Sequence, residues 1–309
     1  MMNDAIQETT IDPTVTSLVT PNFTVQRKEI DKAVYARVRM YESTQNPVYA
    51  LLRRRGELIV WALLWGYIAC FGRFTGSFLL IVVVNCKVIW TQFHAYAHSP
   101  RSFGGLSKTI LRIYSVGTCD LWRKSHQLHH KYTNVKGKDV DIPIYESLKR
   151  SKIAVLIIPY LVIKECSTLC SVSDVVQIVV FFTLRSILIG GLMTPVESLV
   201  GFFINSCYIG VTFGLSHMIE TEYSATSEHP FMNTCNITST WLPRIVLDEI
   251  FGGINYHIEH HMYPTLEWRD LKAIQPILRR FANEHGYPYR EIEWFDFFRH
   301  IDSCQKVAG

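Results

Sequence analysis

The sequence lacks the signatures of secreted, disulfide-stabilised and nucleic-acid-binding proteins. Its eight cysteines form no Cys-x-x-Cys pair and several lie in apolar runs, so we expect reduced thiols that pack as small hydrophobic side chains. The 31 basic and 27 acidic residues are spread along the chain, without a basic stretch interleaved with aromatics, which argues against nucleic-acid binding. The N-terminus has no charged start followed by an apolar core, so it is not typical of a secretory signal.

The sequence is rich in long apolar runs. Hydrophobic residues make up 48% of the chain and the mean hydropathy is +0.12, which is high for a soluble enzyme. A helix needs about 20 largely apolar residues to cross a bilayer. Four runs approach this length and form two pairs, each joined by a short turn, which predicts spans near residues 58–76, 78–93, 175–192 and 196–215.

The charges flanking these runs predict their orientation. Arg53, Arg54 and Arg55 precede the first run and twelve Lys or Arg lie between residues 93 and 174, whereas the two turns carry only Arg73. Because cytoplasmic loops carry the excess of Lys and Arg, the termini and the 93–174 segment are expected in the cytoplasm. The fold prediction is an all-α integral membrane protein with four transmembrane helices in two hairpins and a cytosolic helical cap.

Outside the spans, residues 1–50 form a polar segment that we expect to be partly disordered, and residues 51–309 a single membrane domain. Two shorter apolar runs, Leu106–Tyr114 and Ile153–Ile163, are too short to span. They are candidates for helices at the membrane interface, and plain packing against the domain is an equally good interpretation.

Histidine is concentrated in three clusters, which hold eight of the chain's 12 histidines. Residues three and four apart share a face of a helix, so each cluster can direct two or three imidazoles at a common point. One metal ion takes about four to six ligands, so the number of imidazoles predicts two metal ions sharing a site. The clusters are His94-x-x-x-His98, His126-x-x-His129-His130 and His257-x-x-His260-His261.

The four histidines outside the clusters are not equally good candidates for metal binding. His217 ends the last apolar run and is a ninth candidate ligand, with helix packing as the alternative. His229, His285 and His300 have no histidine at ligand spacing and are not expected to bind metal. Each cluster follows an even number of predicted spans, so all three lie on the cytosolic side. This agreement favours a single site at that membrane face.

The ligand type restricts the chemistry. Imidazole suits iron, copper, nickel and zinc. The absence of a cysteine cluster argues against an iron–sulfur centre, and the absence of Glu-x-x-His pairs argues against a ferritin-type site. A histidine-rich pair of irons at a membrane face favours oxygen activation directed at a hydrocarbon.

The sequence around the clusters resembles a known family. Residues 122–142 and 252–264, which contain the second and third clusters, are similar to the second and third histidine boxes of the front-end branch of the membrane fatty acyl desaturases. The resemblance covers roughly residues 50–290. It implies two Fe ions and an enzyme that uses O2 and two electrons to insert a cis double bond into a long-chain, already unsaturated acyl chain.

The resemblance also implies ligands, partners and a location. The metal ligands carried over are His94, His98, His126, His129, His130, His217, His257, His260 and His261. Front-end members often carry a fused cytochrome b5 domain with a His-Pro-Gly-Gly motif, whereas here His229-Pro230 continues as Phe231-Met232. We therefore expect a separate electron-donor protein, cytochrome b5 or a ferredoxin. The substrate is an acyl lipid or acyl-CoA. The membrane is the endoplasmic reticulum in a eukaryote, and the inner or thylakoid membrane in a prokaryote.

Four polar residues near the boxes, Asp139, Asp141, Asn255 and Glu259, are candidates for holding ligand N–H groups in one tautomer. Ordinary loop or cap hydrogen bonding is the alternative for each, and Glu259 has solvent exposure as a further one. Two functional alternatives also remain open. One is a sphingolipid desaturase or fatty acyl hydroxylase with the same irons. The other is a non-catalytic zinc-binding membrane receptor, which needs only three or four histidines.

Overall fold

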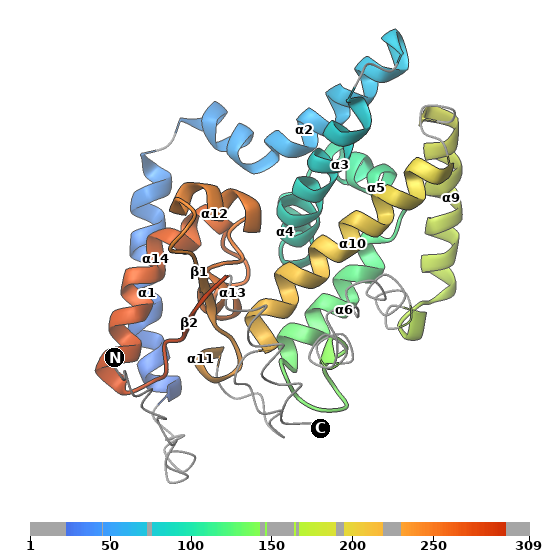
Figure 1. Cartoon of the computed structure of the whole chain (residues 1–309). Helices are drawn as coiled ribbons and strands as arrows, with labels where there is room; N and C mark the ends of the chain where they lie inside the picture. Colours follow the sequence, from blue (N-terminus) through green and yellow to red (C-terminus); the bar gives the residue numbers. More distant parts are fainter. Residues whose placement is uncertain are drawn as a thin grey trace, which may run out of the picture.

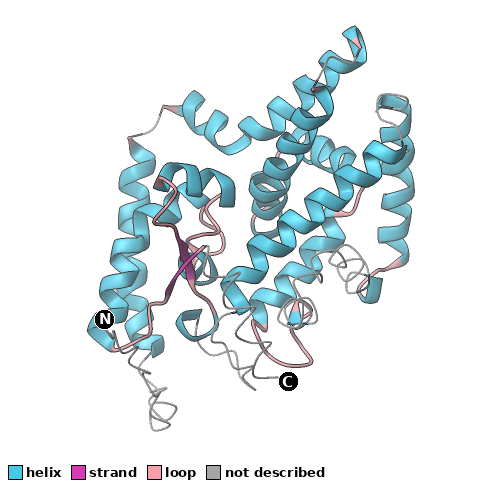
Figure 2. Cartoon of the chain, in the orientation of Figure 1, coloured by secondary structure: helices cyan, strands magenta, loops and turns pink. Residues whose placement is uncertain are grey.

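The computed structural model describes residues 23–44, 46–72, 76–142, 146, 164, 167–189, 195–218 and 230–294. Within these ranges the chain is almost entirely helical, with one small pair of strands (Figure 2). The helical fold class predicted from the apolar runs is confirmed. The predicted interfacial run Ile153–Ile163 lies outside the described residues.

The long apolar helices form one side of the molecule (Figure 1). They are α2 (Pro47–Phe71), α3 (Ser77–Val88), α9 (Val172–Ile189) and α10 (Pro195–Met218). Asn46 caps α2 by accepting a hydrogen bond from the Val48 N–H at 2.8 Å, and Pro47 occupies the first helical position, where its missing N–H does no harm. Both α2 and α10 pack against α3. Each of these helices overlaps one of the four predicted spans in the sequence, although α2 begins at Pro47, well before residue 58.

Membrane-spanning length is reached most clearly by one of these helices. Among the described residues, the continuous helical stretch Ser77–His98 is the one that is long and apolar enough to cross a membrane, judged by length and composition. It comprises α3, the π-helical turn η2 (Ile89–Phe93) and α4 (His94–His98). The four-span count and the hairpin arrangement therefore stay predictions.

Further helices form a cap on the other side, around the third histidine box (Figure 1). They include α11 (Pro230–Asn233), α12 (Arg244–Phe251), α13 (His257–Met262) and α14 (Trp268–His285). Helix α6 (Cys119–Lys131) instead packs on α4, on the side of the apolar bundle (Figure 1). Strands β1 (Asn236–Thr238) and β2 (Glu291–Glu293) pair in parallel, with Asn236 opposite Glu291. A short 3-10 turn, η3 (Pro100–Ser102), follows α4.

The helix α1 (Phe23–Ser43) was not predicted, since the polar composition of residues 1–50 suggested partial disorder. Its apolar residues Ile30, Val34 and Val38 recur every four residues and are at most 6% exposed. They form one core cluster with Leu271, Ile274 and Leu278 of α14. A narrow apolar stripe is enough to bury a helix whose average is polar. Residues 1–22 lie outside the described residues, and the division of the chain at residue 50 stays a prediction.

The short apolar run Leu106–Tyr114 forms α5 (Gly105–Tyr114), which packs on α2 and α9. Leu111 is fully buried and Tyr114 is 8% exposed, as the packing interpretation requires, while Leu106 remains 76% exposed. The helix therefore packs on the apolar bundle.

Candidate metal centre

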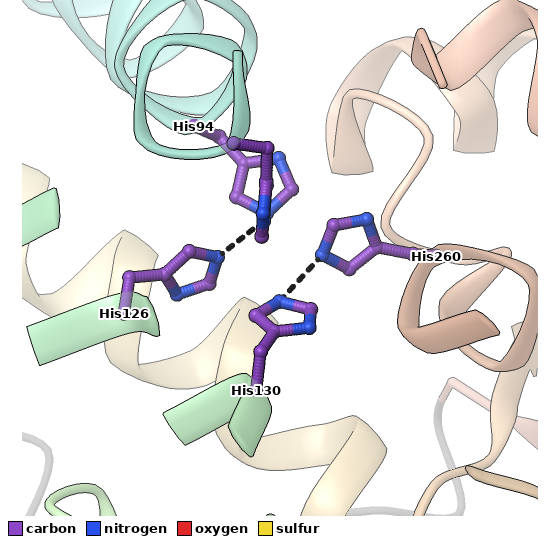
Figure 3. A group of neighbouring side chains, drawn as sticks. His94, His126, His130 and His260 are labelled. Atoms are coloured by element: carbon purple, nitrogen blue, oxygen red, sulfur yellow. Dashed lines mark hydrogen bonds between the residues drawn. The ribbon is translucent and has the colours of Figure 1, made fainter. Parts of the chain in front are cut away.

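The nine candidate histidines gather at the junction of the apolar bundle and the cap, and they divide into two groups. His94, His98, His126, His130 and His260 form the five-histidine group, whose ligand nitrogens all lie within 4.8 Å of one another. Four of these rings converge from three separate helices in Figure 3. His129, His217 and His261 form a second set within the same limit. His257 joins it, because its Nε2 lies 2.6 Å from that of His217 and 3.1 Å from that of His261. We call this set the four-histidine group.

Each His-x-x-His-His box is split between the two groups. His126 and His130 belong to the five-histidine group and His129 to the other, whereas His257 and His261 belong to the four-histidine group and His260 to the first. At about 100° per residue, positions i and i+4 lie only about 40° apart around the helix, while i+3 and i+4 lie about 100° apart. Two imidazoles of each box thus share a point, as the spacing allows, and the third faces the other group. The spacing therefore makes each box a bridge between the groups.

The first box reaches its position through a π-helical turn. The turn η2 (Ile89–Phe93) inserts extra backbone between α3 and the short helix that carries His94 and His98. The hydroxyl of Thr91 donates to the Lys87 carbonyl at 2.8 Å within this widened stretch. Insertions of this kind re-aim the side chains that follow and are frequent at functional sites. The His94 ring lies 4.4 Å from the His260 ring, centroid to centroid.

Hydrogen bonds on the outer side of the four-histidine group fix the tautomers of three rings. The Nδ1 of His129 lies 3.0 Å from Oδ1 of Asp139, and the Nδ1 of His217 lies 3.3 Å from the Asn233 carbonyl oxygen. The Thr133 hydroxyl donates to the His129 carbonyl at 2.9 Å, so it accepts from Nδ1 of His261 at 3.3 Å. In their neutral forms, these rings therefore hold their proton on Nδ1 and direct an Nε2 lone pair inward.

Burial keeps most of the imidazoles neutral, which is the form that binds metal. In the second and third boxes, burial lowers the pKa well below its ordinary value for five rings: His126, His130, His257, His260 and His261. Burial also acts on His129, but the carboxylates of Asp139 and Asp141 outweigh it and raise the pKa of that ring. Burial would raise the pKa of Asp139 in turn, and the His129 ring, with the N–H groups of Asp141 and Asn134, holds it below the ordinary value.

The nitrogen spacing tests whether metal ions fit. The Nε2 atoms lie 2.9 Å apart in the pairs His98–His126 and His130–His260, and 3.1 Å apart in the pair His129–His217. At such distances two facing imidazole nitrogens either share a proton or bind one cation between them. Metal–nitrogen bonds are about 2.1 Å long, so neutral imidazoles this close together can bind a common metal ion.

The four polar residues near the boxes have different surroundings. Asp139 contacts His129, and Asp141 lies 3.5 Å from the same Nδ1. The Asn255 amide instead donates to Asp248 at 2.8 Å. Glu259 is completely buried, so its predicted alternative of facing solvent is wrong; Asn236 donates to it at 2.8 Å and the Tyr289 hydroxyl donates to its other oxygen. Burial raises the pKa of Glu259 to about 7, against the opposing effect of these hydrogen bonds.

Several residues that support the site were not found from the sequence. The indole of Trp122 stacks on the His126 ring at 4.6 Å with an interplanar angle of 11°. Asn134 is fully buried with a positive φ of 58°, and its N–H donates to Asp139 at 2.7 Å. Asparagine tolerates this backbone region better than most residues. Thr133, Asn233 and Asn236 have no sequence signal, because each is recognised only by its tertiary partners.

A cavity of about 190 Å³ lies beside the centre. His94, Gln92, Arg54, Arg55 and Trp268 are among its lining residues. Arg54 pairs with Glu267 at 2.9 Å, while the 8%-exposed Arg55 lies over the Phe103 ring and donates to the Ser102 carbonyl. The cavity thus joins polar residues at the start of α2 to one histidine of the five-histidine group.

Comparison with known proteins agrees with this geometry. The family model described as fatty acid desaturase matches residues 70–293. The chain is 31% identical over 131 residues to the Delta(5) fatty acid desaturase fat-4 of Caenorhabditis elegans, covering 42% of this chain and 27% of that protein. It is 25% identical over 226 residues to the Delta(8)-fatty-acid desaturase of Euglena gracilis, covering 58% and 53%.

A Delta(8)-fatty-acid desaturase of Arabidopsis thaliana is 25% identical over 132 residues, covering 40% of this chain and 28% of that protein. The matches thus span between about a quarter and a half of the length of these relatives. The family match itself covers most of the chain, including all three histidine boxes and His217. The resemblance inferred from the boxes is confirmed, and the chain belongs to the fatty acid desaturase family.

Proposed function

We propose that this chain is a front-end acyl desaturase that holds two iron ions, one in each histidine group, and inserts a cis double bond into a long-chain, already unsaturated acyl chain. The observation that carries the proposal is the division of nine inward-facing imidazoles into two adjacent groups. The names of the relatives, Delta(5) and Delta(8) desaturases, support the front-end type. Bound iron would supply the oxidising power, drawn from O2 and two electrons, that breaks an unactivated C–H bond.

The number of histidine ligands favours iron over zinc. A structural zinc ion takes four ligands in a tetrahedron, whereas the first group offers five histidines. This number of ligands disfavours the alternative of a zinc-binding receptor. The protein's own contribution is to keep the imidazoles neutral, fix their tautomers and exclude water.

The membrane arrangement belongs to the same proposal. Four spans in two hairpins, formed by α2, α3, α9 and α10, would place the nine ligands at the cytosolic face. Large exposed apolar side chains on these helices support contact with lipid, including Leu63 at 68%, Leu79 at 67% and Ile187 at 75% exposed. Lys87, within α3, is held by Glu249 of the cap at 2.7 Å, so the cap reaches the apolar bundle at that level.

We propose the cavity beside His94 as the route of the acyl chain to the centre. It is lined both by Arg54 and Arg55 of α2 and by His94 of the five-histidine group. We propose that the acyl carrier, a lipid or CoA, stays at the polar end while the hydrocarbon passes inward. Electrons would come from an electron-transfer protein, cytochrome b5 or a ferredoxin, at the cytosolic side.

Expression in yeast supplied with linoleic and α-linolenic acids tests the proposal. Gas chromatography of fatty acid methyl esters, with double-bond location, should show a new polyunsaturated product whose new bond lies on the carboxyl side of the existing ones. A hydroxylated product would favour the hydroxylase alternative. Metal analysis of the purified protein should give two irons per chain, and one zinc without iron would contradict the proposal.

A further inference from the structure

A short segment that contains no histidine is hydrogen-bonded to α10, to α13 and to the loop that directly follows α6. The segment is Asn233–Ile237, which runs from the end of α11 into β1. The four histidines come from α6, α10 and α13, which are far apart in sequence. Since metal ligands must be held within a fraction of an ångström, something must fix these three elements relative to one another.

Asn233 connects the loop that follows α6 to α10. Its carbonyl oxygen accepts from Nδ1 of His217 at 3.3 Å and from the Asn134 side chain at 3.0 Å. Its own amide donates to the Thr133 carbonyl at 3.4 Å. Asn134 in turn donates its backbone N–H to Asp139, the carboxylate that holds His129. One asparagine thus ties the orientation of His217 to that of His129.

Asn236 holds the start of α13. Its Oδ1 accepts from the Ile258 N–H at 2.9 Å, and its Nδ2 donates to Glu259 and to the Tyr289 hydroxyl, both at 2.8 Å. The helix has no capping side chain of its own at Tyr256. Asn236 therefore satisfies one of the orphan N–H groups of α13 from another part of the chain. This helix begins with His257 and also carries His261.

The backbone between the two asparagines completes the connection. The Cys235 N–H donates at 3.1 Å to the carbonyl of Ser216, the residue before His217, and the Ile237 N–H donates at 3.0 Å to the Asn255 carbonyl. Asn233, Cys235, Asn236 and Ile237 are between 1% and 5% exposed. The segment is short, buried and hydrogen-bonded on both sides.

We infer that Asn233–Ile237 is the positioning segment of the four-histidine group, and that Asn233 and Asn236 are its positioning residues. The inference rests on the proposed function in taking the four histidines as ligands of one ion. Loss of Asn236 should weaken binding of that ion more than binding in the five-histidine group, because α13 carries two of the four ligands, His257 and His261, but only His260 of the other five. Partners of metal ligands typically change metal affinity by about 10–100-fold.

The experiment measures Fe(II) affinity by chelator competition and the metal-to-protein ratio, together with the Tm of the metal-free protein. Asn236→Ala should lower the affinity for one of two ions by about 10–100-fold. Asn85→Ala is the matched control, because Asn85 is also a buried asparagine and accepts from Trp61 at 3.0 Å within the apolar bundle. The control should lower the Tm and leave the ratio at two.

A charge-conserving exchange separates positioning from general loss of structure. In Asn236→Asp the Nδ2 donor is replaced by a carboxylate oxygen that faces Oε2 of Glu259. Because two acceptors then face each other, this variant should release the ion. Adding Glu259→Gln reverses the donor and the acceptor and should restore the ratio, because both the Ile258 N–H and the Tyr289 hydroxyl keep an acceptor. Recovery of metal binding in the double variant would support a positioning role.

The outcomes distinguish the two proposals. Two irons in both the unmodified protein and Asn236→Ala, with equal affinities, would overturn the positioning role and leave the proposed function intact. A single zinc in the unmodified protein would overturn the proposed function. The positioning role would then be decided by whether Asn236→Ala weakens the binding of that zinc ion.

Discussion

A glycine in the turn before the third histidine box makes the sharpest test of the fold. Gly253 has a φ of +82°, and a Cβ added there would lie 2.2 Å from Cβ of Trp268. Two separate penalties therefore act on Gly253→Ala. The backbone must hold a left-handed conformation with a side chain, and the added methyl group must displace the first residue of α14.

The two penalties can be given magnitudes. A left-handed conformation costs a non-glycine residue about 1–2 kcal/mol. Overpacking of a well-packed site costs a further 1–3 kcal/mol or so. We therefore expect Gly253→Ala to lower the free energy of unfolding by about 2–5 kcal/mol. At roughly 2 °C for each kcal/mol in a chain of this size, the Tm should fall by about 4–10 °C.

The chain offers a matched control in Gly286, which ends α14 with a φ of +71° and has no atom within 4 Å of an added Cβ. Gly286→Ala carries the backbone penalty alone, about 1–2 kcal/mol, so its Tm should fall by only about 2–4 °C. Both variants are measured by thermal unfolding of purified protein in the same detergent. Equal Tm values for Gly253→Ala and Gly286→Ala would refute the close contact with Trp268.

Three further predictions concern the site and the cap. His129→Ala should abolish formation of the desaturated product, whereas His285→Ala should retain it, because the His285 ring packs on Phe281 of its own helix. Gas chromatography of the products of both variants tests this, and equal activity would contradict the ligand assignment. Asp139→Asn should weaken metal affinity about 10–100-fold, measured by chelator competition, because the charged acceptor of His129 is lost. Lys87→Met should change the free energy of unfolding by less than about 1 kcal/mol in chemical denaturation, because its partner Glu249 is 48% exposed.

The nine histidines show how much of the candidate metal site could be predicted from the sequence. Spacing on helices was enough to single out eight of them, the end of an apolar run indicated His217, and the number of imidazoles was enough to suggest two metal ions. The same spacing contains the split within each box, since i and i+4 share a direction that i+3 does not. Which direction faces which group depends on how α6 and α13 cross, so the sequence left the assignment of His129 and His260 open.

The order of the apolar helices and their approximate positions along the chain were also predictable. Long apolar runs bounded by charged residues and short turns form helices however the rest of the fold packs. The helix α1 was missed for the opposite reason. Its three buried residues are a small part of a polar stretch, and their burial depends on α14, which lies more than 200 residues further along the chain.

The sequence by itself therefore determined the helical class, the family and the residues able to bind metal, because local periodicity and ligand chemistry are properties of short segments. Only the tertiary structure decided the two-group arrangement, the burial of Glu259 and the connecting role of Asn233 and Asn236. Hydrogen bonds between residues about 20 to 100 positions apart leave no local pattern, since any buried polar residue can serve once the fold brings its partner within reach.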